Sequence, residues 1–428
     1  MKKPSEDNIL SHQNELPESE AIEGGAEELE AGSDFEEAAQ TEPGDAGAKS
    51  NAAEELSGYK FMKPVSVKHS SHSSRSGSGH HHHHGHRKRR RKKMKTWKKV
   101  LIIVMSVLLA IVIAVTTVVL ILVNQGYTEL FDVQLDVKVP ATVQAEVQDS
   151  GDYISYNGAM YQYNHDITSL LFMGVDKRSI EGENEQGTGG QADLVVLIAI
   201  NVKDHKMSMI AVPRDTIAEV AKYTPNGHYN GMANMQICLA YAYGDGKESS
   251  CDNMVSSVRK VFYNIPIKTY YALDLDGIAA MNDAVGGVDV VSPETIGEFT
   301  EGEKYHLEGK EAENFVRDRD KSDVNSSMLR LERQKVYARS YLNKVQSKLK
   351  SNPTSAVSMF NDSAPYSCTN LNAAKVAYLA KEFMFGGGMK TDIVSVPGEM
   401  SYDGSHAAYT IDEKQFFEQF LSVYYERV

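Results

Sequence analysis

The sequence predicts an α/β protein, a three-layer α-β-α sandwich with a mixed central sheet, preceded by one transmembrane helix and a disordered N-terminal tail. Three observations lead to this class. Residues 1–99 are strongly polar, residues 100–123 form an uncharged and almost wholly apolar run, and strand-like runs then alternate with amphipathic segments. Such alternation is typical of a sheet whose faces are covered by helices.

Residues 1–99 are predicted to be a disordered cytoplasmic tail with three sections. The first sixty residues carry sixteen acidic side chains against four lysines, so they bury too little apolar surface to fold. A Ser/His-rich section follows, and its run His80–His84 is interpreted as a solvated linker, with transition-metal binding as the alternative. The last section is basic, with ten Lys or Arg among the thirteen residues from Arg87 to Lys99.

Residues 100–123 are predicted to be a single transmembrane helix. Twenty-four helical residues reach about 36 Å, which exceeds the roughly 30 Å of a hydrocarbon core. Basic residues stay on the cytoplasmic side, so residues 1–99 are expected inside and residues 124–428 outside the cell membrane. A basic block that directly adjoins an apolar helix favours anionic membrane lipid over nucleic acid as its partner.

Outside the membrane, residues 124–166 are expected to form a stalk with leading strands, and residues 167–350 and 351–428 two parts of one α/β domain. The apolar pattern predicts strands at 169–174, 194–201, 207–212, 268–273, 288–291 and 392–396, and helices at 232–243, 251–263, 276–284, 309–315, 327–349, 370–383 and 411–425.

The three cysteines all fall on the predicted outer side, where disulfides persist. A helical hairpin over 232–263 would bring Cys238 close to Cys251, so a bridge between these two is predicted. Two buried free thiols are the alternative, and Cys368 is left over.

Two carboxylates lie at the ends of predicted strands: Asp176 follows one strand and Asp193 begins the next. An acidic pair of this kind suits Mg²⁺, which takes one or two carboxylates and fills its other positions with water and phosphate oxygens. The alternative is that each aspartate only forms a turn.

Arginines gather in the sequence around the same elements. Arg214 follows a strand, and a second group consists of Arg317, Arg319, Arg330, Arg333 and Gln334. The last three share one helical face at i, i+3 and i+4, near a helix N-terminus. Guanidinium groups and helix N-termini both bind phosphate, so this group is predicted to surround a polyanion. The alternative is a surface helix whose arginines pair with Glu332 or Asp320.

These motifs together resemble the LytR-CpsA-Psr family of Gram-positive cell-envelope proteins over about residues 166–349. The matching segments, in chain order, are GVDKR at 174–178, Asp193 at the start of a strand, VPRDT at 212–216, NDAVGGVDV at 282–290, RDR at 317–319 and RLERQ at 330–334.

The resemblance implies an extracytoplasmic phosphotransferase that moves a glycopolymer, such as a teichoic acid or capsule, from a polyprenyl-pyrophosphate carrier onto peptidoglycan. It implies that Asp176 and Asp193 hold Mg²⁺ and that the polyprenyl tail occupies an apolar tunnel between sheet and helices. The pyrophosphate contacts it implies are Arg178, Arg214, Arg317, Arg319, Arg330, Arg333 and Gln334. Asp176, Asp193, Arg214 and Asp323 are the residues expected to carry the chemistry.

The sequence departs from the family pattern at three places. Gln191 stands where the family usually has an arginine, and Ser327 where it usually has an aspartate. Asp323 is the expected substitute for that aspartate, either as an anchor for an arginine or as a proton acceptor. Residues 181–190 form a Gly/Glu-rich insertion that is expected to act as a mobile flap.

Two other functions fit the sequence. In the first alternative, the chain is a non-catalytic surface protein that binds anionic glycan and signals through its tail. In the second, it is a polyprenyl-pyrophosphate hydrolase in which water replaces the acceptor hydroxyl. The transferase remains the first prediction, because the lipid-linked pyrophosphate itself supplies the energy where no nucleotide is present.

Overall fold

The computed structural model describes residues 94–180, 187, 189–320, 322–323, 326–385, 389–402 and 406–428. The α-helices are α1 (Thr96–Phe131), α2 (Leu239–Ala242), α3 (Glu248–Val261), α4 (Leu275–Ala284), α5 (Lys310–Arg317), α6 (Ser326–Ser351), α7 (Ser355–Ser363), α8 (Ala373–Phe385) and α9 (Glu413–Tyr424). The strands are β1 (Glu146–Gln148), β2 (Tyr153–Tyr156), β3 (Ala159–Tyr163), β4 (Ile167–Val175), β5 (Ala192–Asn201), β6 (Lys206–Val212), β7 (Ile217–Tyr223), β8 (Tyr229–Gln236), β9 (Thr269–Leu273), β10 (Val288–Val291), β11 (Lys304–Leu307), β12 (Ser367–Thr369), β13 (Lys390–Ser395), β14 (Gly398–Tyr402), β15 (Ala407–Ile411) and β16 (Tyr425–Arg427).

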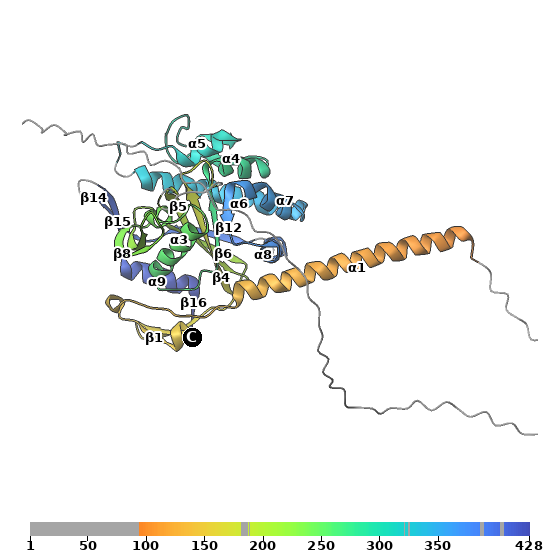
Figure 1. The fold of residues 1–428 in the computed structure, drawn as a ribbon, viewed down its shortest axis with the longest axis horizontal. Helices are drawn as coiled ribbons and strands as arrows, with labels where there is room; N and C mark the ends of the chain where they lie inside the picture. Colours follow the sequence, from red (N-terminus) through yellow and green to blue (C-terminus); the bar gives the residue numbers. More distant parts are fainter. Residues whose placement is uncertain are drawn as a thin grey trace, which may run out of the picture. The chain divides into compact units, whose positions relative to one another are not determined.

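A six-stranded mixed sheet forms the centre of the domain, in the order β12-β9-β4-β5-β6-β13 (Figure 1). The pairs β4–β9 and β6–β13 are parallel, whereas β4–β5, β5–β6 and β9–β12 are antiparallel. The two long hairpin pairings set the register, with Leu171 opposite Leu197 and Val196 opposite Ala211. The predicted mixed sheet is therefore confirmed.

Helices cover both faces of this sheet. Successive residues of each strand point to opposite faces, so a central strand contributes to two different apolar clusters. On β5, Val195 and Leu197 join the apolar cluster that includes residues of α3 and α9. Val196 and Ile200 of the same strand lie in a different cluster, with residues of α6 and α8. Two helical layers around one sheet make the predicted three-layer sandwich, which is confirmed.

A third apolar cluster joins α4, α5 and the β10–β11 hairpin to one side of α6. Its fully buried centre includes Phe315 of α5 and Val288 of β10, and Phe299 packs edge-on against Phe315. Asp274 caps the N-terminus of α4 by accepting a hydrogen bond from the Gly277 N–H (2.8 Å). This packing fixes α5, which carries Arg317, against α6, which carries Arg330 and Arg333.

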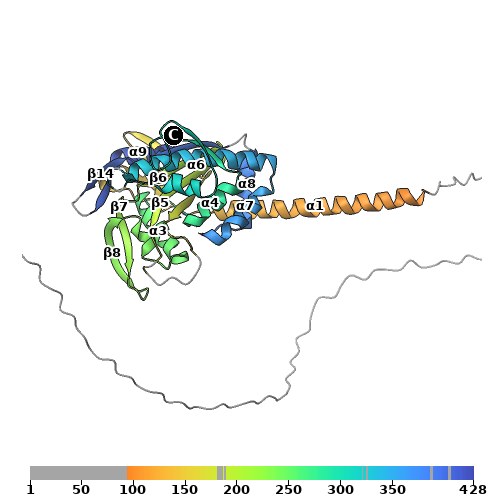
Figure 2. The ribbon, with the colours of Figure 1, turned by 90° about the horizontal axis from the view of Figure 1, so that it is seen from above.

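Helix α1 is the element of the described chain that is long and apolar enough to cross a membrane, by length and composition. It continues past the predicted end at residue 123 to Phe131, so the first part of the predicted stalk is helical. Its last turns pack on α8, where Gly126 lies against the backbone of Ala374 and Tyr127 against Tyr378 (Figures 1 and 2). A side chain at position 126 would collide with that backbone.

The helix predicted over 232–243 is wrong. Its first five residues belong to strand β8, which pairs antiparallel with β7, and only the four residues of α2 are helical (Figure 2). Gly231, directly before the segment, has a φ of 81°, which an α-helix does not use, and the neighbouring strand supplies the hydrogen bonds of β8. The apolar spacing of this segment therefore reflects a hairpin packed on β15 and α3.

Candidate anion-binding site

The two predicted carboxylates lie at one edge of the central sheet. Strand β4 ends at Val175 and its antiparallel partner β5 begins at Ala192, so Asp176 and Asp193 are at the same end of the pair. The Asp176 N–H donates to the Gln191 carbonyl (3.0 Å), and the Gln191 N–H donates to Oδ1 of Asp176 (2.6 Å). The hairpin pairing thus holds both carboxylates at this edge.

Arg214 reaches Asp193 from the neighbouring strand. It follows Pro213 at the end of β6, and its Nη1 donates to Oδ1 of Asp193. Its Nη2 donates to the side-chain oxygen of Gln191. Its Nε lies 3.5 Å from the buried Asp215. Arg214 is therefore held on three sides by groups that orient it.

Arg330 approaches the same carboxylate from the other side. It lies in the first turns of α6, and its Nη1 donates to Oδ2 of Asp193 (3.1 Å). Asp193 consequently lies between two guanidinium groups, one from a strand end and one from a helix. The pocket at this point, which we call the arginine pocket, is lined by Asp193, Val212, Pro213, Arg214, Ser327, Met328, Arg330, Leu331 and Gln334.

Arg330 is the most unusual group in the arginine pocket. Only 4% of it is exposed, and burial lowers the pKa of its guanidinium to about 10, with the nearby charges of Arg319 and Arg214 adding to the effect. Its Nη2 is buried and has no hydrogen-bond partner among the residues that the structure describes. Arg330 stays charged at neutral pH, so the pocket combines several cations with an unused donor, which is the arrangement that an anion completes.

Arg178 and Arg317 meet at a second carboxylate, which is not part of the arginine pocket. Both donate to Oε1 of Glu313 in α5, at 2.8 and 3.1 Å, and the Glu313 side chain is only 5% exposed. Arg178 also donates to Asp276 of α4 (2.6 Å), and these hydrogen bonds raise the pKa of its guanidinium. The structure therefore joins two of the predicted arginines through a buried acid that the sequence analysis did not single out.

Arg333 and Gln334 bind the protein itself. Arg333 is 1% exposed and donates to the carbonyls of Phe315 and Asp318 and to the carboxylate of Glu294. Gln334 lines the arginine pocket, but its amide donates to the Val316 carbonyl (2.9 Å). Through these hydrogen bonds Arg333 connects α6 to the end of α5.

The remaining predicted residues, Arg319 and Asp323, lie in the segment that precedes α6. Arg319 is exposed, yet its charge acts on Arg330. The backbone carbonyl of Asp323 accepts a hydrogen bond from the Ser326 N–H (3.1 Å). Of the predicted flap at 181–190, residues 181–186 and 188 lie outside the described residues, as does the run His80–His84.

The predicted bridge between Cys238 and Cys251 is wrong in this structure. Cys238 lies between β8 and α2, and its sulfur lies 3.5 Å from Nη2 of Arg214 and 3.8 Å from the Gln191 oxygen. Burial raises the pKa of its thiol. Without a helix over 232–243 there is no helical hairpin, and Cys251 lies buried in α3 with a different thiol as its neighbour.

Sequence reasoning missed Glu313 and Asp215, and it treated Gln191 only as a departure. A signal existed for Glu313, because it precedes Arg317 by one helical turn on a helix whose neighbouring positions are apolar. No comparable signal marks Asp215, whose burial follows from contacts with Arg214 and with Gln236 of β8 (3.1 Å).

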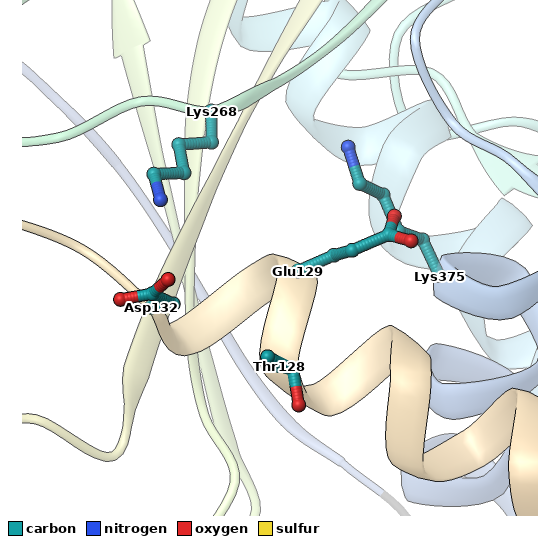
Figure 3. Close-up of a pocket in the computed structure, with 5 residues that line it drawn as sticks. All are labelled: Thr128, Glu129, Asp132, Lys268 and Lys375. Carbon is teal, nitrogen blue, oxygen red and sulfur yellow. The ribbon is translucent and has the colours of Figure 1, made fainter. Parts of the chain in front are cut away.

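A larger and more open pocket lies at the end of α1 and shares no residue with the arginine pocket. It is lined by Thr128, Glu129, Asp132, Lys268 and Lys375 (Figure 3). Its charges are mixed, Lys375 donates to the Asn370 carbonyl (3.2 Å), and Glu129 accepts from Asn372 (2.7 Å). Since these groups already have partners, we place the candidate site at the arginine pocket.

An α/β sandwich with a buried cationic pocket at one sheet edge has the features of an anion-binding protein. The chain belongs to the LytR_cpsA_psr family, whose family model matches residues 133–422. The family prediction made from the motifs is therefore confirmed.

Curated relatives from bacilli share part of the chain. The polyisoprenyl-teichoic acid–peptidoglycan teichoic acid transferase TagV of Bacillus subtilis (strain 168) is 27% identical over 256 residues, which cover 56% of this chain and 59% of that protein. The enzyme named TagU of Bacillus cereus is 34% identical over 153 residues, or 35% of this chain and 43% of that protein. The chain thus spans about half the length of the curated relatives it matches. The crystal structure of B. subtilis TagV is 24% identical with a TM-score of 0.46, covering 60% of this chain and 97% of that one.

Proposed function

We propose that the protein is a membrane-anchored phosphotransferase of the cell envelope. It transfers a glycan phosphate from a polyprenyl-pyrophosphate carrier to a hydroxyl of peptidoglycan, with the described domain outside the membrane and residues 1–99 inside. The names of the curated relatives describe a transfer of this kind from a polyisoprenyl-linked teichoic acid to peptidoglycan. The basic section before α1 supports the orientation.

The observation that carries the proposal is the buried, incompletely bonded guanidinium of Arg330. A buried donor without a partner costs about 1–3 kcal/mol, and two further arginines that act on it increase the cost of its charge. A pyrophosphate would remove both costs, because its oxygens accept hydrogen bonds and its charge balances the cations. Met328 is the apolar residue of this pocket that is partly exposed, so the first part of the lipid tail would lie against it.

The reaction requires little beyond positioning and charge stabilisation. The peptidoglycan hydroxyl attacks the phosphorus bonded to the sugar, the bond from that phosphorus to the bridging oxygen breaks, and polyprenyl phosphate leaves. Arg214 and Arg330 stabilise the charge that develops on the phosphate oxygens. The hydroxyl proton passes to a carboxylate, for which Asp323, in the segment before α6, is the candidate from the sequence.

We propose that the carboxylates at the sheet edge would hold a magnesium ion. Asp176 and Asp193 offer only oxygen ligands, and within the described ranges no group of three or more His, Cys, Asp or Glu side chains that could hold a metal ion is found. Mg²⁺ takes one or two carboxylates and keeps water and phosphate oxygens in its other positions, which is what supports the proposal. Each carboxylate oxygen that accepts a hydrogen bond here has a second lone pair. When bound, the ion would neutralise charge on the pyrophosphate.

A transfer assay with the full-length protein in detergent tests the proposal. The donor is a polyprenyl-pyrophosphate-linked glycan with a radiolabelled sugar, and the acceptor is isolated peptidoglycan. The expected products are labelled peptidoglycan and polyprenyl phosphate, and Asp176→Asn or addition of EDTA should abolish both. Arg339→Met is the matched control, because Arg339 is exposed on α6 and does not line the pocket. Release of polyprenyl phosphate with no label on peptidoglycan would identify a hydrolase, and no release at all a non-catalytic protein.

A further inference from the structure

Two cysteines far apart in the sequence lie side by side in the core. Cys251 is in the first turn of α3 and is fully buried. Cys368 is the middle residue of β12, where it pairs with Ala272 of β9 at the edge of the central sheet. Helix α3 packs on both β9 and β12, so these elements bring the two side chains into one apolar cluster.

The two thiols also interact with each other. The side-chain hydrogen bond between them is the first cause of the raised pKa of Cys251 and of the lowered pKa of Cys368. Cys368 is also the more exposed of the two, which makes it the accessible and more readily ionised thiol of the pair.

We infer that Cys251 and Cys368 form a disulfide in the protein outside the membrane. The inference rests on the proposed orientation of the domain, because thiols in contact persist as thiols in a reducing cytosol but are oxidised in an extracytoplasmic compartment. The third cysteine, Cys238, takes no part, since it is buried against Arg214 at the site.

The exchange has a defined order. The Cys368 thiolate attacks one sulfur of the disulfide of an extracytoplasmic thiol-disulfide oxidoreductase, which forms a mixed disulfide and releases a first thiolate. Cys251 then attacks the Cys368 sulfur, and its proton goes to the second leaving thiolate. The two cysteines lose two electrons, and the donor disulfide gains them as it becomes two thiols.

The bond fastens a short edge strand to the core. Strand β12 has only three residues, and it leads into α8, the helix that packs on α1. A covalent link from α3 to β12 closes a loop of more than a hundred residues, which strongly restricts the unfolded chain. We expect the melting temperature of the oxidised protein to exceed that of the reduced protein by about 5–10 °C.

Peptide mapping tests the pairing directly. Trypsin cleaves after Lys222, Lys247, Arg259, Lys350 and Lys375, so the three cysteines fall in separate peptides, 223–247, 248–259 and 351–375. Full-length protein from cell envelopes is alkylated in denaturant without reductant and then digested. The inference predicts that peptides 248–259 and 351–375 are linked, and that Cys238 is alkylated. Alkylation of both Cys251 and Cys368, or a link from Cys251 to Cys238, would overturn it.

A variant series separates the disulfide from general destabilisation. The double variant Cys251→Ser/Cys368→Ser should melt at the same temperature with and without reductant, whereas Cys238→Ser should keep the reductant-dependent fall of the unchanged protein. Equal sensitivity to reductant in the double variant and the unchanged protein would contradict the inference. The transfer assay on the same preparations is a separate readout, so a linked but inactive protein would refute only the proposed function.

Discussion

Two arginines on α6, three residues apart, have opposite surroundings. Both Arg330 and Arg333 are buried, and burial lowers the pKa of each. Arg333 donates hydrogen bonds to two backbone carbonyls at the end of α5 and to the carboxylate of Glu294. Arg330, by contrast, keeps one buried donor without a partner among the described residues. Burial alone therefore does not mark a binding residue. Because Arg333 is fully bonded and Arg330 is not, we propose Arg330 as the ligand-binding arginine and expect Arg333 to be structural.

Among substitutions of the buried arginines and their partners, Arg330→Met is expected to have the largest effect on activity. The variant removes a donor aimed at the phosphate, so kcat/KM for the lipid-linked donor should fall by about 100-fold or more. Its stability should stay within about 1 kcal/mol of the unchanged protein, because Asp193 keeps its pairing with Arg214. Transfer kinetics test the fall in kcat/KM, and thermal melting tests the unchanged stability, with Arg339→Met as the control for both. A strong loss of stability would make Arg330 a structural residue.

Arg333→Met should show the reverse. The substitution leaves Glu294 and two carbonyls without their partner, so unfolding should become easier by about 3 kcal/mol. Thermal melting should show a fall of roughly 5–10 °C. At a temperature where the variant is folded, KM for the donor should be close to normal, and a large rise in KM there would place Arg333 in the binding site.

Glu313→Gln should have a smaller effect that falls on binding. The buried carboxylate holds both Arg178 and Arg317, and an amide of the same shape keeps the packing but loses the charge-assisted hydrogen bonds. Because both arginines are about half exposed, solvent weakens these pairs, and KM for the donor should rise only about threefold to tenfold with kcat little changed. An unchanged KM would show that the two arginines need no such support.

The smallest effect concerns the pH dependence of stability and rests on Asp274, the N-cap of α4. Burial raises the pKa of the Asp274 carboxyl to about 6. Between about pH 4 and 6 the folded protein therefore binds more protons than the unfolded chain, and this group lowers the free energy of unfolding as pH rises. Asp274→Asn keeps an N-cap and removes the titration, so its melting temperature should change less over this interval. The same pH dependence in both proteins would exclude this cause.

Local patterns were enough to predict most of the central fold. The strands that end at Val175 and Val212 are apolar runs with polar ends, and α6 and α9 follow helical periodicity with clear boundaries. The hairpin of β7 and β8 was missed because its apolar spacing fits a helix and only pairing with another strand decides otherwise. Helix α7 was missed because its sequence is rich in polar residues.

The candidate site was predictable only as a set of positions. Strand ends placed Asp176, Asp193 and Arg214 at one edge, since polar groups collect where strands stop. Periodicity put Arg330 and Arg333 on one face of α6 but could not distinguish them, because the carbonyls that bind Arg333 belong to the end of α5. The cysteine neighbours were unpredictable for the same reason: sequence spacing says nothing about which distant strand lies beside α3.

The central claim is that the arginine pocket binds pyrophosphate through the free donor of Arg330. The most direct test is equilibrium binding of geranylgeranyl pyrophosphate to the full-length protein in detergent, measured for the unchanged protein, Arg330→Met and Arg339→Met. We expect Arg330→Met to bind at least tenfold more weakly, as the loss of a charge-assisted hydrogen bond of about 1.5–3 kcal/mol implies, and Arg339→Met to bind normally. Equal affinity in all three proteins would contradict the account.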